Sequence, residues 1–322
     1  MKKIIIVTIL FILSLSLSAQ FIVNEEPVVL ETPSGNIYGT LKMPIVNSKP
    51  IPVVLIIAGS GPTDRDGNNP QMKNNSLKML SDGLFYYNIA SLSFDKRGIG
   101  ESKDAMKEES DLRFGDYIND VRGWVDLLSK DKRFSEIVIA GHSEGSLIGM
   151  VAAQDNPKVK KYISIAGSGK KAADILKEQM QDRLKGQPET LKETIFSYID
   201  KLEKGETVSG IPPSLNTLFR PSVQPYMISW FKYNPQKEIN KLKIPVLIIQ
   251  GDMDIQVPVE HAELLRKANP DSEIIIIKKM NHVLKDCEHK DLQSQMFTYT
   301  DPSVLINNQI VKYISGFILE AI

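Results

Sequence analysis

Short apolar runs alternate with longer amphipathic segments along most of this chain. The runs are continuous and rich in β-branched residues, as is typical of strands buried on both faces of a sheet. They occupy residues 53–58, 89–94, 136–140, 162–166, 245–250 and 273–277. Helical periodicity marks the segments between several of them, such as 73–87 and 114–130. Strands that alternate with helices predict crossover connections and a mostly parallel sheet, which is an α/β fold.

The ends of the chain carry two further patterns. Residues 27–43 consist of two strand-like runs around Ser34-Gly35-Asn36, which predicts a β-hairpin. Residues 304–319 have the pattern of a closing helix.

The alternation stops in the middle of the chain. Residues 170–243 contain no strand-like run and consist of segments rich in Lys, Glu and Gln, interrupted by Gly and Pro. We therefore predict an α/β core formed by residues 20–169 and 244–322. Residues 170–243 are predicted to form a helical cap inserted above the sheet.

The first residues have the organisation of a secretory signal peptide. A basic start, Met1-Lys2-Lys3, precedes an apolar run from Ile4 to Leu17 and the small residues Ser18-Ala19. The apolar run is shorter than the roughly 20 residues that a membrane span needs. We predict that residues 1–19 are removed, that the mature protein is periplasmic or secreted, and that it has no stable membrane insertion. An uncleaved N-terminal anchor is the alternative.

Composition excludes several classes of function. The chain has 322 residues with 39 Lys and Arg against 39 Asp and Glu, so nothing indicates a basic surface for nucleic acid. The single cysteine, Cys287, allows neither an intramolecular disulfide nor a cysteine-based zinc site. We expect no metal and no organic cofactor, and the oligomeric state stays open.

Candidate chemistry begins at Gly141-His142-Ser143-Glu144-Gly145. This motif follows the strand-like run at 136–140 and precedes a helix-like run at 147–153, so it is G-x-S-x-G in a strand–turn–helix context. A serine hydroxyl is a poor nucleophile unless a turn holds it beside a base and free N–H donors. Glycines allow strand and helix to approach closely at such a turn. Ser143 is the predicted nucleophile.

A base and an orienting acid are expected where neighbouring strands end. Asp254 follows the run at 245–250, and His282 follows the run at 273–277. The order Ser, Asp, His along the chain is one in which these three groups occur together in hydrolytic sites. His282 would accept the Ser143 proton and return it to the leaving group, and Asp254 would hold the imidazole in the required tautomer. Asp252, two residues after the same strand, is the alternative acid or a turn cap.

Three other histidines compete with His282 for the role of base. His142 lies inside the turn beside the serine, His261 falls in a predicted helix, and His289 lies in the polar stretch 285–290. We predict packing or solvent-exposed positions for the last two, and a position from which His142 cannot easily reach around the serine.

Four motifs in order carry a resemblance to a known family. They are Gly59-Ser60-Gly61-Pro62, Asp95-Lys96-Arg97-Gly98-Ile99-Gly100-Glu101-Ser102, the Ser143 motif, and Gly251-Asp252-Met253-Asp254 with Asn281-His282. From Pro27 onward the chain resembles α/β-hydrolases of the esterase and serine-aminopeptidase-like group. The resemblance implies an eight-stranded, mostly parallel sheet flanked by helices, a Ser-Asp-His triad and a variable helical cap. One departure is Ala58-Gly59, where many relatives carry His-Gly.

Further residues are predicted around the nucleophile. The backbone N–H groups of Glu144 and Ser60 are the expected oxyanion donors, with Gly61 as the alternative to Ser60. Gly61, Asp64 and Arg65 are predicted substrate contacts at the cleft mouth, and the competing interpretation of the last two is a self-bonded turn. Met227 and Trp230 are predicted to line an acyl pocket, or else to serve as packing.

The predicted function is hydrolysis of a small-molecule carboxylic ester through a Ser143 acyl-enzyme. One alternative is an aminopeptidase or amidase acting on small peptides, which would need a carboxylate such as Glu144 or Asp64 to anchor the free α-amino group. The other alternative is a non-catalytic exported binding module on the same scaffold.

Overall fold

A single twisted sheet organises the molecule. The computed structural model describes residues 24–44 and 49–320, so the predicted signal peptide at 1–19 lies outside the described residues. The eight strands have the order β1-β2-β4-β3-β5-β6-β7-β8. They are β1 (Asn24–Thr32), β2 (Gly35–Met43), β3 (Ile51–Ile57), β4 (Ala90–Phe94), β5 (Phe134–His142), β6 (Val159–Ile165), β7 (Val246–Gly251) and β8 (Glu273–Ile277).

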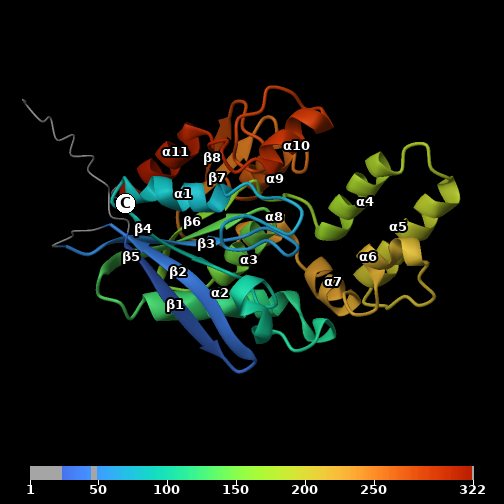
Figure 1. Cartoon of the computed structure of the whole chain (residues 1–322), viewed down its shortest axis with the longest axis horizontal. Helices are drawn as coiled ribbons and strands as arrows, with labels where there is room; N and C mark the ends of the chain where they lie inside the picture. Colours follow the sequence, from blue (N-terminus) through green and yellow to red (C-terminus); the bar gives the residue numbers. More distant parts are fainter. Residues whose placement is uncertain (1–23, 45–48, 321–322) are drawn as a thin grey trace, which may run out of the picture.

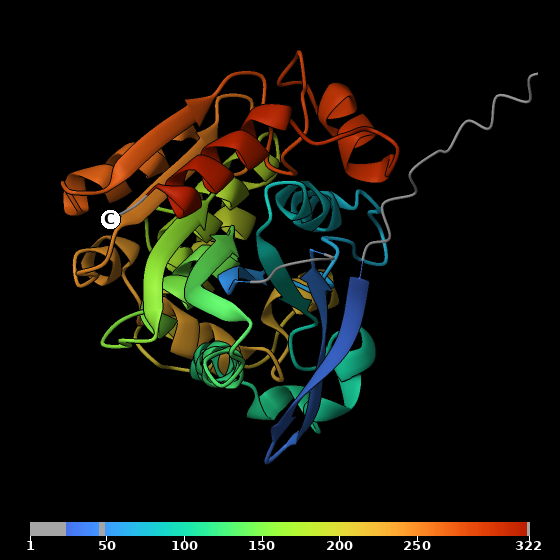
Figure 2. The ribbon, with the colours of Figure 1, turned by 90° about the vertical axis from the view of Figure 1, so that its left-hand side faces the viewer.

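The sheet is parallel except at one edge. β1 pairs antiparallel with β2, and β2 pairs antiparallel with β4, whereas all other neighbours are parallel. Figure 2 shows the β1–β2 hairpin at one edge of the sheet and β7 and β8 at the opposite edge. The predicted α/β class and the eight-stranded, mostly parallel sheet are confirmed.

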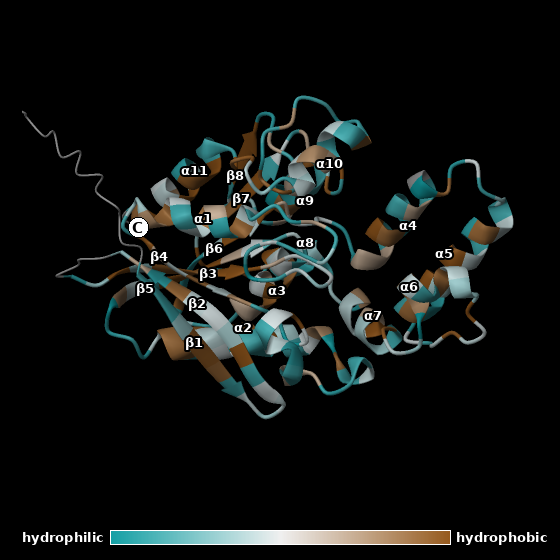
Figure 3. Cartoon of the chain, in the orientation of Figure 1, coloured by the Kyte–Doolittle hydropathy of each residue, from teal (hydrophilic) through white to brown (hydrophobic). Residues whose placement is uncertain are grey.

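Helices cover both faces of the sheet because the strands bury apolar side chains on both sides. One apolar cluster joins the sheet to α1 (Ser76–Phe85) and α11 (Asn308–Leu319). The cluster on the other face includes α2 (Phe114–Leu128), α3 (Glu144–Ala152) and α9 (Val259–Ala268). In Figure 3 the central strands have hydrophobic colours and the surrounding loops are mostly hydrophilic.

Helices alone connect β6 to β7. All residues between these strands are described, and they form α4 (Ala172–Arg183), α5 (Glu189–Glu203), α6 (Asn216–Phe219), α7 (Gln224–Phe231) and α8 (Pro235–Ile239), with a 3₁₀ turn at Pro213–Leu215 and no strand. Figure 1 shows α4 to α7 standing at one end of the sheet. They share a small apolar cluster of their own, which includes Ile195, Ile199, Phe219, Met227 and Phe231. We call α4 to α7 the cap.

Two features near the C-terminus differ from the predicted pattern. The closing helix begins at Asn308 rather than at 304, because the Asn307 side chain accepts a hydrogen bond from the Gln309 amide and caps the helix there. An additional helix, α10 (Leu292–Thr300), begins after Asp291, whose side chain accepts from the Ser294 amide.

Two 3₁₀ turns, Gly100–Ala105 and Glu109–Asp111, precede α2. None of the helices in residues 24–44 and 49–320 is long and apolar enough to cross a bilayer.

Candidate active site

Ser143 sits in a tight turn between β5 and α3. Its backbone has φ 55° and ψ −120°, a conformation that non-glycine residues rarely adopt and that is often found at functional sites. A Cβ at Gly141 would lie 2.1 Å from the Gly145 carbonyl oxygen, and a Cβ at Gly145 would lie 2.4 Å from the Ile57 carbonyl oxygen. Both glycines of the motif are therefore required by the close approach of strand and helix.

The three residues predicted as nucleophile, base and acid lie together. His282 Nε2 is 3.1 Å from Ser143 Oγ, and His282 Nδ1 is 2.7 Å from Asp254 Oδ2. Ser143 follows β5, Asp254 follows β7 and His282 follows β8. These parallel strands end at the same edge of the sheet. His282 and Asp254 are buried, whereas Ser143 is partly exposed. The arrangement gives a hydroxyl, an imidazole and a carboxylate in hydrogen-bonded series.

Asp254 is held as a carboxylate by several donors. Its Oδ1 accepts from the amides of Gln256 at 2.8 Å and Val257 at 2.9 Å, and its Oδ2 accepts from Gln250 Nε2 at 2.9 Å as well as facing His282. Burial alone raises the pKa of this carboxyl, but the His282 charge and these hydrogen bonds outweigh burial and hold the pKa below its usual value. Asp252 instead accepts from the Lys279 amide at 2.7 Å and serves as a turn cap.

The lowered pKa of Asp254 predicts a specific loss of stability in acid. A carboxyl whose pKa is lower in the folded protein stabilises the fold above its ordinary value of 3.8, and this stabilisation is lost as the pH falls through the folded pKa. The free energy of unfolding should therefore fall more steeply between about pH 5 and about pH 3 in the wild type than in Asp254→Asn, which cannot titrate. Urea unfolding at a series of pH values measures both slopes, and equal slopes would contradict the prediction.

His142 has a supporting position that the sequence did not predict. Its Nε2 lies 2.8 Å from the His282 carbonyl oxygen, and the two rings are 4.9 Å apart. Burial, together with the neighbouring His282, lowers the pKa of His142 to about 4. A neutral imidazole with its proton on Nε2 donates to that carbonyl and so fixes the loop that carries His282.

The other two histidines lie away from the serine. His261 is buried in α9 and accepts a hydrogen bond from the Gly169 amide at 3.2 Å, so it is a packing residue. His289 is exposed, although Lys285 in the same polar stretch is buried and donates to the Asp301 carbonyl.

The loop after β3 lies against the nucleophile. A Cβ at Gly59 would be 3.2 Å from Ser143 Cβ, so the backbone at this point passes directly beside the serine. Ser60 lines the same cavity as Ser143 and His282. Gly61 follows with φ 69°, in the left-handed region that favours glycine, and no heavy atom lies within 4 Å of the position of its missing Cβ.

The cavity beside Ser143 is small, and polar and apolar groups contribute equally to its walls. Its volume is about 120 Å³, and its walls include Thr63, Met72, Asn74, Gln256, Val283 and Tyr299. Tyr299 is buried on α10, and its hydroxyl oxygen accepts from Gln256 Nε2 at 2.7 Å. Neither residue was predicted, because α10 lacks a clear apolar stripe and Gln256 lies in a loop.

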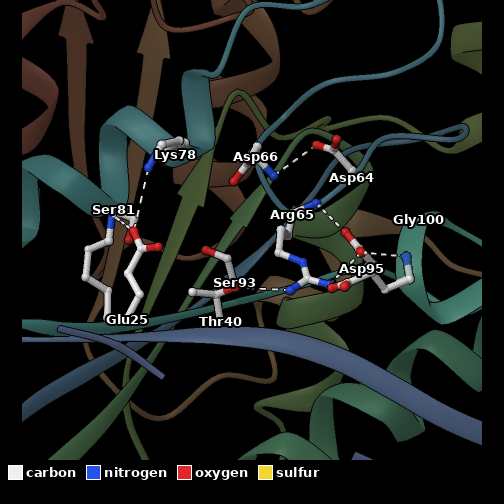
Figure 4. A pocket seen from close by; sticks show the side chains of 12 residues that line it. Glu25, Thr40, Asp64, Arg65, Asp66, Lys78, Ser81, Ser93, Asp95 and Gly100 are labelled. Atoms are coloured by element: carbon white, nitrogen blue, oxygen red, sulfur yellow. Dashed lines mark hydrogen bonds and ion pairs between the residues drawn. The ribbon is translucent and has the colours of Figure 1, made fainter. Parts of the chain in front are cut away.

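The structure corrects the prediction that Asp64 and Arg65 contact substrate at the mouth of this cavity. Both line a separate, more open hollow of about 530 Å³ beside β1, β2 and β4 (Figure 4). Ser143, Asp254 and His282 do not line this hollow. Arg65 donates to Asp95 at 2.7 Å and also to Glu101, while Asp64 Oδ1 accepts from two amides of its own loop. Their role is to build a turn, which was the competing interpretation.

Met227 and Trp230 also differ from their predicted role. Met227 is buried in the apolar cluster of the cap, and the Trp230 ring is stacked on Phe114 with centroids 6.1 Å apart. Neither residue is among those that line the 120 Å³ cavity. Both serve as packing, because an aromatic or methionine side chain at helical spacing fits a helix interface as readily as a pocket. Within the described residues, no group of three or more His, Cys, Asp or Glu side chains is arranged to hold a metal ion.

Comparisons with known proteins find hydrolases that are similar to this chain in sequence or in fold. A family model described as serine aminopeptidase, S33, matches residues 75–194, which include Ser143 but neither Asp254 nor His282. Est1E from Butyrivibrio proteoclasticus, solved with ferulic acid bound, superposes with a TM-score of 0.59 at 18% identity, covering 91% of this chain and 100% of that one. The Pyrococcus furiosus esterase PF2001 superposes with a TM-score of 0.57 at 16% identity, covering 92% and 90%. The chain has the α/β-hydrolase fold. 

Two curated relatives are similar to this chain in sequence, one named an esterase and the other a serine hydrolase. The chain is 28% identical over 253 residues to the esterase EstD of Thermotoga maritima, covering 76% of this chain and 57% of that protein. It therefore spans little more than half the length of that relative. It is 25% identical over 237 residues to the human serine hydrolase BPHL, covering 70% of each chain.

Proposed function

We propose that this α/β-hydrolase is a serine hydrolase that cleaves carboxylic esters through an acyl-enzyme on Ser143. The observation that carries the proposal is the hydrogen-bonded series from Asp254 through His282 to Ser143, with separations of 2.7 and 3.1 Å. The 3.1 Å separation is within the range in which a base can accept a proton from a nucleophile, and the 2.7 Å contact with Asp254 orients that base.

The proposed reaction has two matched halves. Ser143 Oγ attacks the ester carbonyl carbon while its proton moves to His282 Nε2, and the carbonyl oxygen becomes an oxyanion. When the intermediate collapses, the bond to the leaving oxygen breaks and His282 delivers the proton to that oxygen, which departs as an alcohol. Water then attacks the acyl carbon with the same proton transfers and releases the carboxylic acid. Asp254, ionised and buried, stabilises the imidazolium in both halves.

The oxyanion is proposed to bind two backbone amides. One is the amide of Glu144 at the start of α3, where the helix dipole also favours negative charge. The other is the amide of Ser60, in the loop that lies against Ser143. Amides fixed in this way need no rearrangement when the charge develops, which is the main electrostatic contribution to catalysis in such sites.

Ester substrates are favoured over peptides with a free amino terminus. An aminopeptidase must anchor the α-amino group, and Glu144 and Asp64 were the two candidate carboxylates. Glu144 is buried and bonded to Lys96 and Tyr226, and Asp64 is bonded to amides of its own loop. Neither carboxylate is presented to a ligand beside Ser143, and two of the relatives above are named esterases.

The size of the cavity predicts a preference for short acyl groups. A cavity of about 150 Å³ holds one benzene molecule, so the 120 Å³ beside Ser143 accommodates a slightly smaller group. We expect kcat/KM for p-nitrophenyl acetate and butyrate to exceed that for the octanoate by about tenfold or more, because the longer chain leaves the cavity. Steady-state kinetics on this ester series, with alanine and leucine p-nitroanilides alongside, measures both preferences.

Two results of that screen would count against the proposal. Turnover of the anilides without turnover of any ester would favour the aminopeptidase alternative. Equal kcat/KM values for acetate and octanoate would show that the 120 Å³ cavity does not hold the acyl group.

Export of the protein is a separate proposal that rests only on residues 1–19.

A further inference from the structure

A buried ion pair adjoins the two segments that carry the proposed oxyanion donors. Lys96 follows β4, Glu144 follows Ser143, and their side chains are 1% and 3% exposed. Lys96 Nζ is 3.3 Å from Glu144 Oε2 and also donates a hydrogen bond to the Gly59 carbonyl oxygen. The ammonium also lies 5.1 Å from the centre of the Tyr117 ring. The proposed mechanism does not use either charged group.

Stability alone does not account for this pair. Removing two charges from water is costly, and replacing a buried ion pair with apolar side chains of similar volume is often neutral or stabilising. A charged pair at the centre of the nucleophile turn therefore invites a functional explanation. Its partners point to one, because both contacts of Lys96 lead to segments that carry the proposed oxyanion donors.

The first contact acts on the Ser60 amide. The Gly59 carbonyl and the Ser60 N–H belong to one planar peptide, in which they point in opposite directions. A lysine that holds the carbonyl oxygen from below therefore aims the N–H away from itself, towards the other side of the loop. Hydrogen bonds in series also polarise one another, so the charged donor makes this amide a stronger donor.

The second contact acts on Glu144, whose own amide is the other proposed donor. The Glu144 carboxylate is held at both oxygens, at Oε2 by Lys96 and at Oε1 by the Tyr226 hydroxyl at 2.6 Å. Burial and the neighbouring carboxylate raise the pKa of Tyr226, so the phenol keeps the proton that it donates. The first residue of α3 is thereby fixed from two sides.

Tyr226 also links this pair to the cap. It lies on α7, and its ring packs against Tyr117 of α2 with centroids 5.8 Å apart. The neighbouring Ser229 accepts a hydrogen bond from the Phe114 amide at the start of α2. The cap therefore contacts the nucleophile turn through the Tyr226 hydroxyl and packs against α2 through the rings.

From these contacts we propose that Lys96 and Glu144 are positioning residues that orient the two oxyanion amides, and that Tyr226 makes this orientation depend on the docked cap. The inference rests on the proposed function of Ser143. It adds that the ion pair acts on the transition state, where the oxyanion forms, and hardly on the binding of the uncharged ester.

The test replaces the pair with apolar side chains in Lys96→Met/Glu144→Leu. We expect the midpoint of urea unfolding to change little, because the variant no longer buries two charges but also removes a partner of the Gly59 carbonyl and of the Tyr226 hydroxyl. We also expect kcat for p-nitrophenyl acetate to fall about 10- to 100-fold, which is less than the effect of deleting an oxyanion donor outright. KM should stay within about twofold. Inhibition by a trifluoromethyl ketone, which forms an oxyanion on Ser143, should weaken by the same factor as kcat/KM. A purely structural pair would change neither kcat nor this inhibition.

Two single variants complete the experiment. Tyr226→Phe removes one hydroxyl, and we expect about a threefold fall in kcat that disappears in the Lys96→Met/Glu144→Leu background, because both act through Glu144. Lys161→Met is the matched control. Lys161 is also a buried lysine, but it donates to the carbonyls of Phe317, Ile318 and Glu320 at the end of α11. This control should lower the unfolding midpoint and leave kcat unchanged.

The outcomes separate this inference from the proposed function. Wild-type kcat and inhibitor affinity in the double variant, or an equal fall in kcat for Lys161→Met, would overturn the inference. If the double variant does not fold, an unchanged kcat in Tyr226→Phe would overturn the link to the cap, and an unchanged kcat in Glu144→Gln would overturn the role of the pair. If the wild type reacts with a fluorophosphonate at Ser143 but hydrolyses no ester, the proposed substrate is wrong. The labelling rates of the same variants then decide the inference, because labelling also develops charge on an oxygen at this site.

Discussion

Ser143→Ala is expected to reduce kcat for p-nitrophenyl acetate by about 10³-fold or more, as removal of the nucleophile does in other triad enzymes. The Oγ atom is the proposed site of the new covalent bond, and in this fold it is aligned with His282 Nε2 at 3.1 Å. The variant keeps the turn, the oxyanion amides and the cavity, so the affinity for a product carboxylate should change little. Initial rates at saturating ester, with binding of acetate or butyrate as the second measurement, check both statements.

A neighbouring serine gives the matched control for this substitution. Ser146 is buried three residues further along, and its Oγ bonds to the Tyr162 hydroxyl at 2.9 Å and the Ser164 hydroxyl at 2.8 Å. Ser146→Ala should reduce the unfolding midpoint because it leaves buried hydroxyls with fewer partners, but kcat should stay within a few-fold. Retained activity in Ser143→Ala together with lost activity in Ser146→Ala would contradict the assignment of the nucleophile.

Asp254→Asn is expected to reduce kcat by about 10³- to 10⁴-fold, as the corresponding change does in another serine hydrolase. The contacts of Asp254 explain why. The amides of Gln256 and Val257 require an acceptor at the Oδ1 position, so the asparagine carbonyl must occupy it. The asparagine NH₂ then points at His282 Nδ1, which becomes an acceptor, and the imidazole proton moves to Nε2. An Nε2–H cannot accept the Ser143 proton.

Asp252→Asn is the control that separates the two candidate acids. Its side chain accepts from the Lys279 amide, which an asparagine carbonyl can replace, so kcat should stay within about twofold. The dependence of kcat/KM on pH, measured for both variants and the wild type, should change only for Asp254→Asn. Reversed effects in the two variants would assign the acid to Asp252.

The sheet and the positions of Ser143, Asp254 and His282 could be predicted from the sequence, because both follow from the order of strands along the chain and from the residues directly after them. Buried parallel strands appear as apolar runs such as 245–250, and their ends meet at one edge of the sheet whatever the loops do. Asp254 and His282 could therefore be placed beside Ser143 without any knowledge of loop conformation. Gly141 and Gly145 carried their own signal, because only a close approach of strand and helix requires both.

The cavity walls could not be predicted, because they depend on contacts between distant segments. Tyr299 lies on α10, where Phe297 is 61% exposed and Met296 is 39% exposed, so the helix has no apolar stripe that periodicity could detect. Arg65 was ambiguous for a different reason. A charged loop has the same composition whether it faces a ligand or pairs with Asp95, and only the fold brings Asp95 within 2.7 Å.

Residues of the cap were ambiguous because its helices have a core of their own. Met227 and Trp230 are apolar at helical spacing, which is equally compatible with a pocket and with packing. Lys96 carried a weak signal that was available in advance. It is a charged residue two positions after a fully buried strand, in one of the four motifs that carry the family resemblance, and such a residue needs a partner when it is buried.

The most direct test of the central claim is intact-mass and peptide mass spectrometry after reaction with a fluorophosphonate ester. We predict one adduct per chain, located on the peptide that contains Ser143, absent in Ser143→Ala and formed much more slowly in His282→Gln. The reason is that Ser143 Oγ becomes a strong nucleophile only when His282 Nε2, 3.1 Å away, accepts the hydroxyl proton. An adduct on another residue, or undiminished ester hydrolysis in Ser143→Ala without any adduct, would contradict the account.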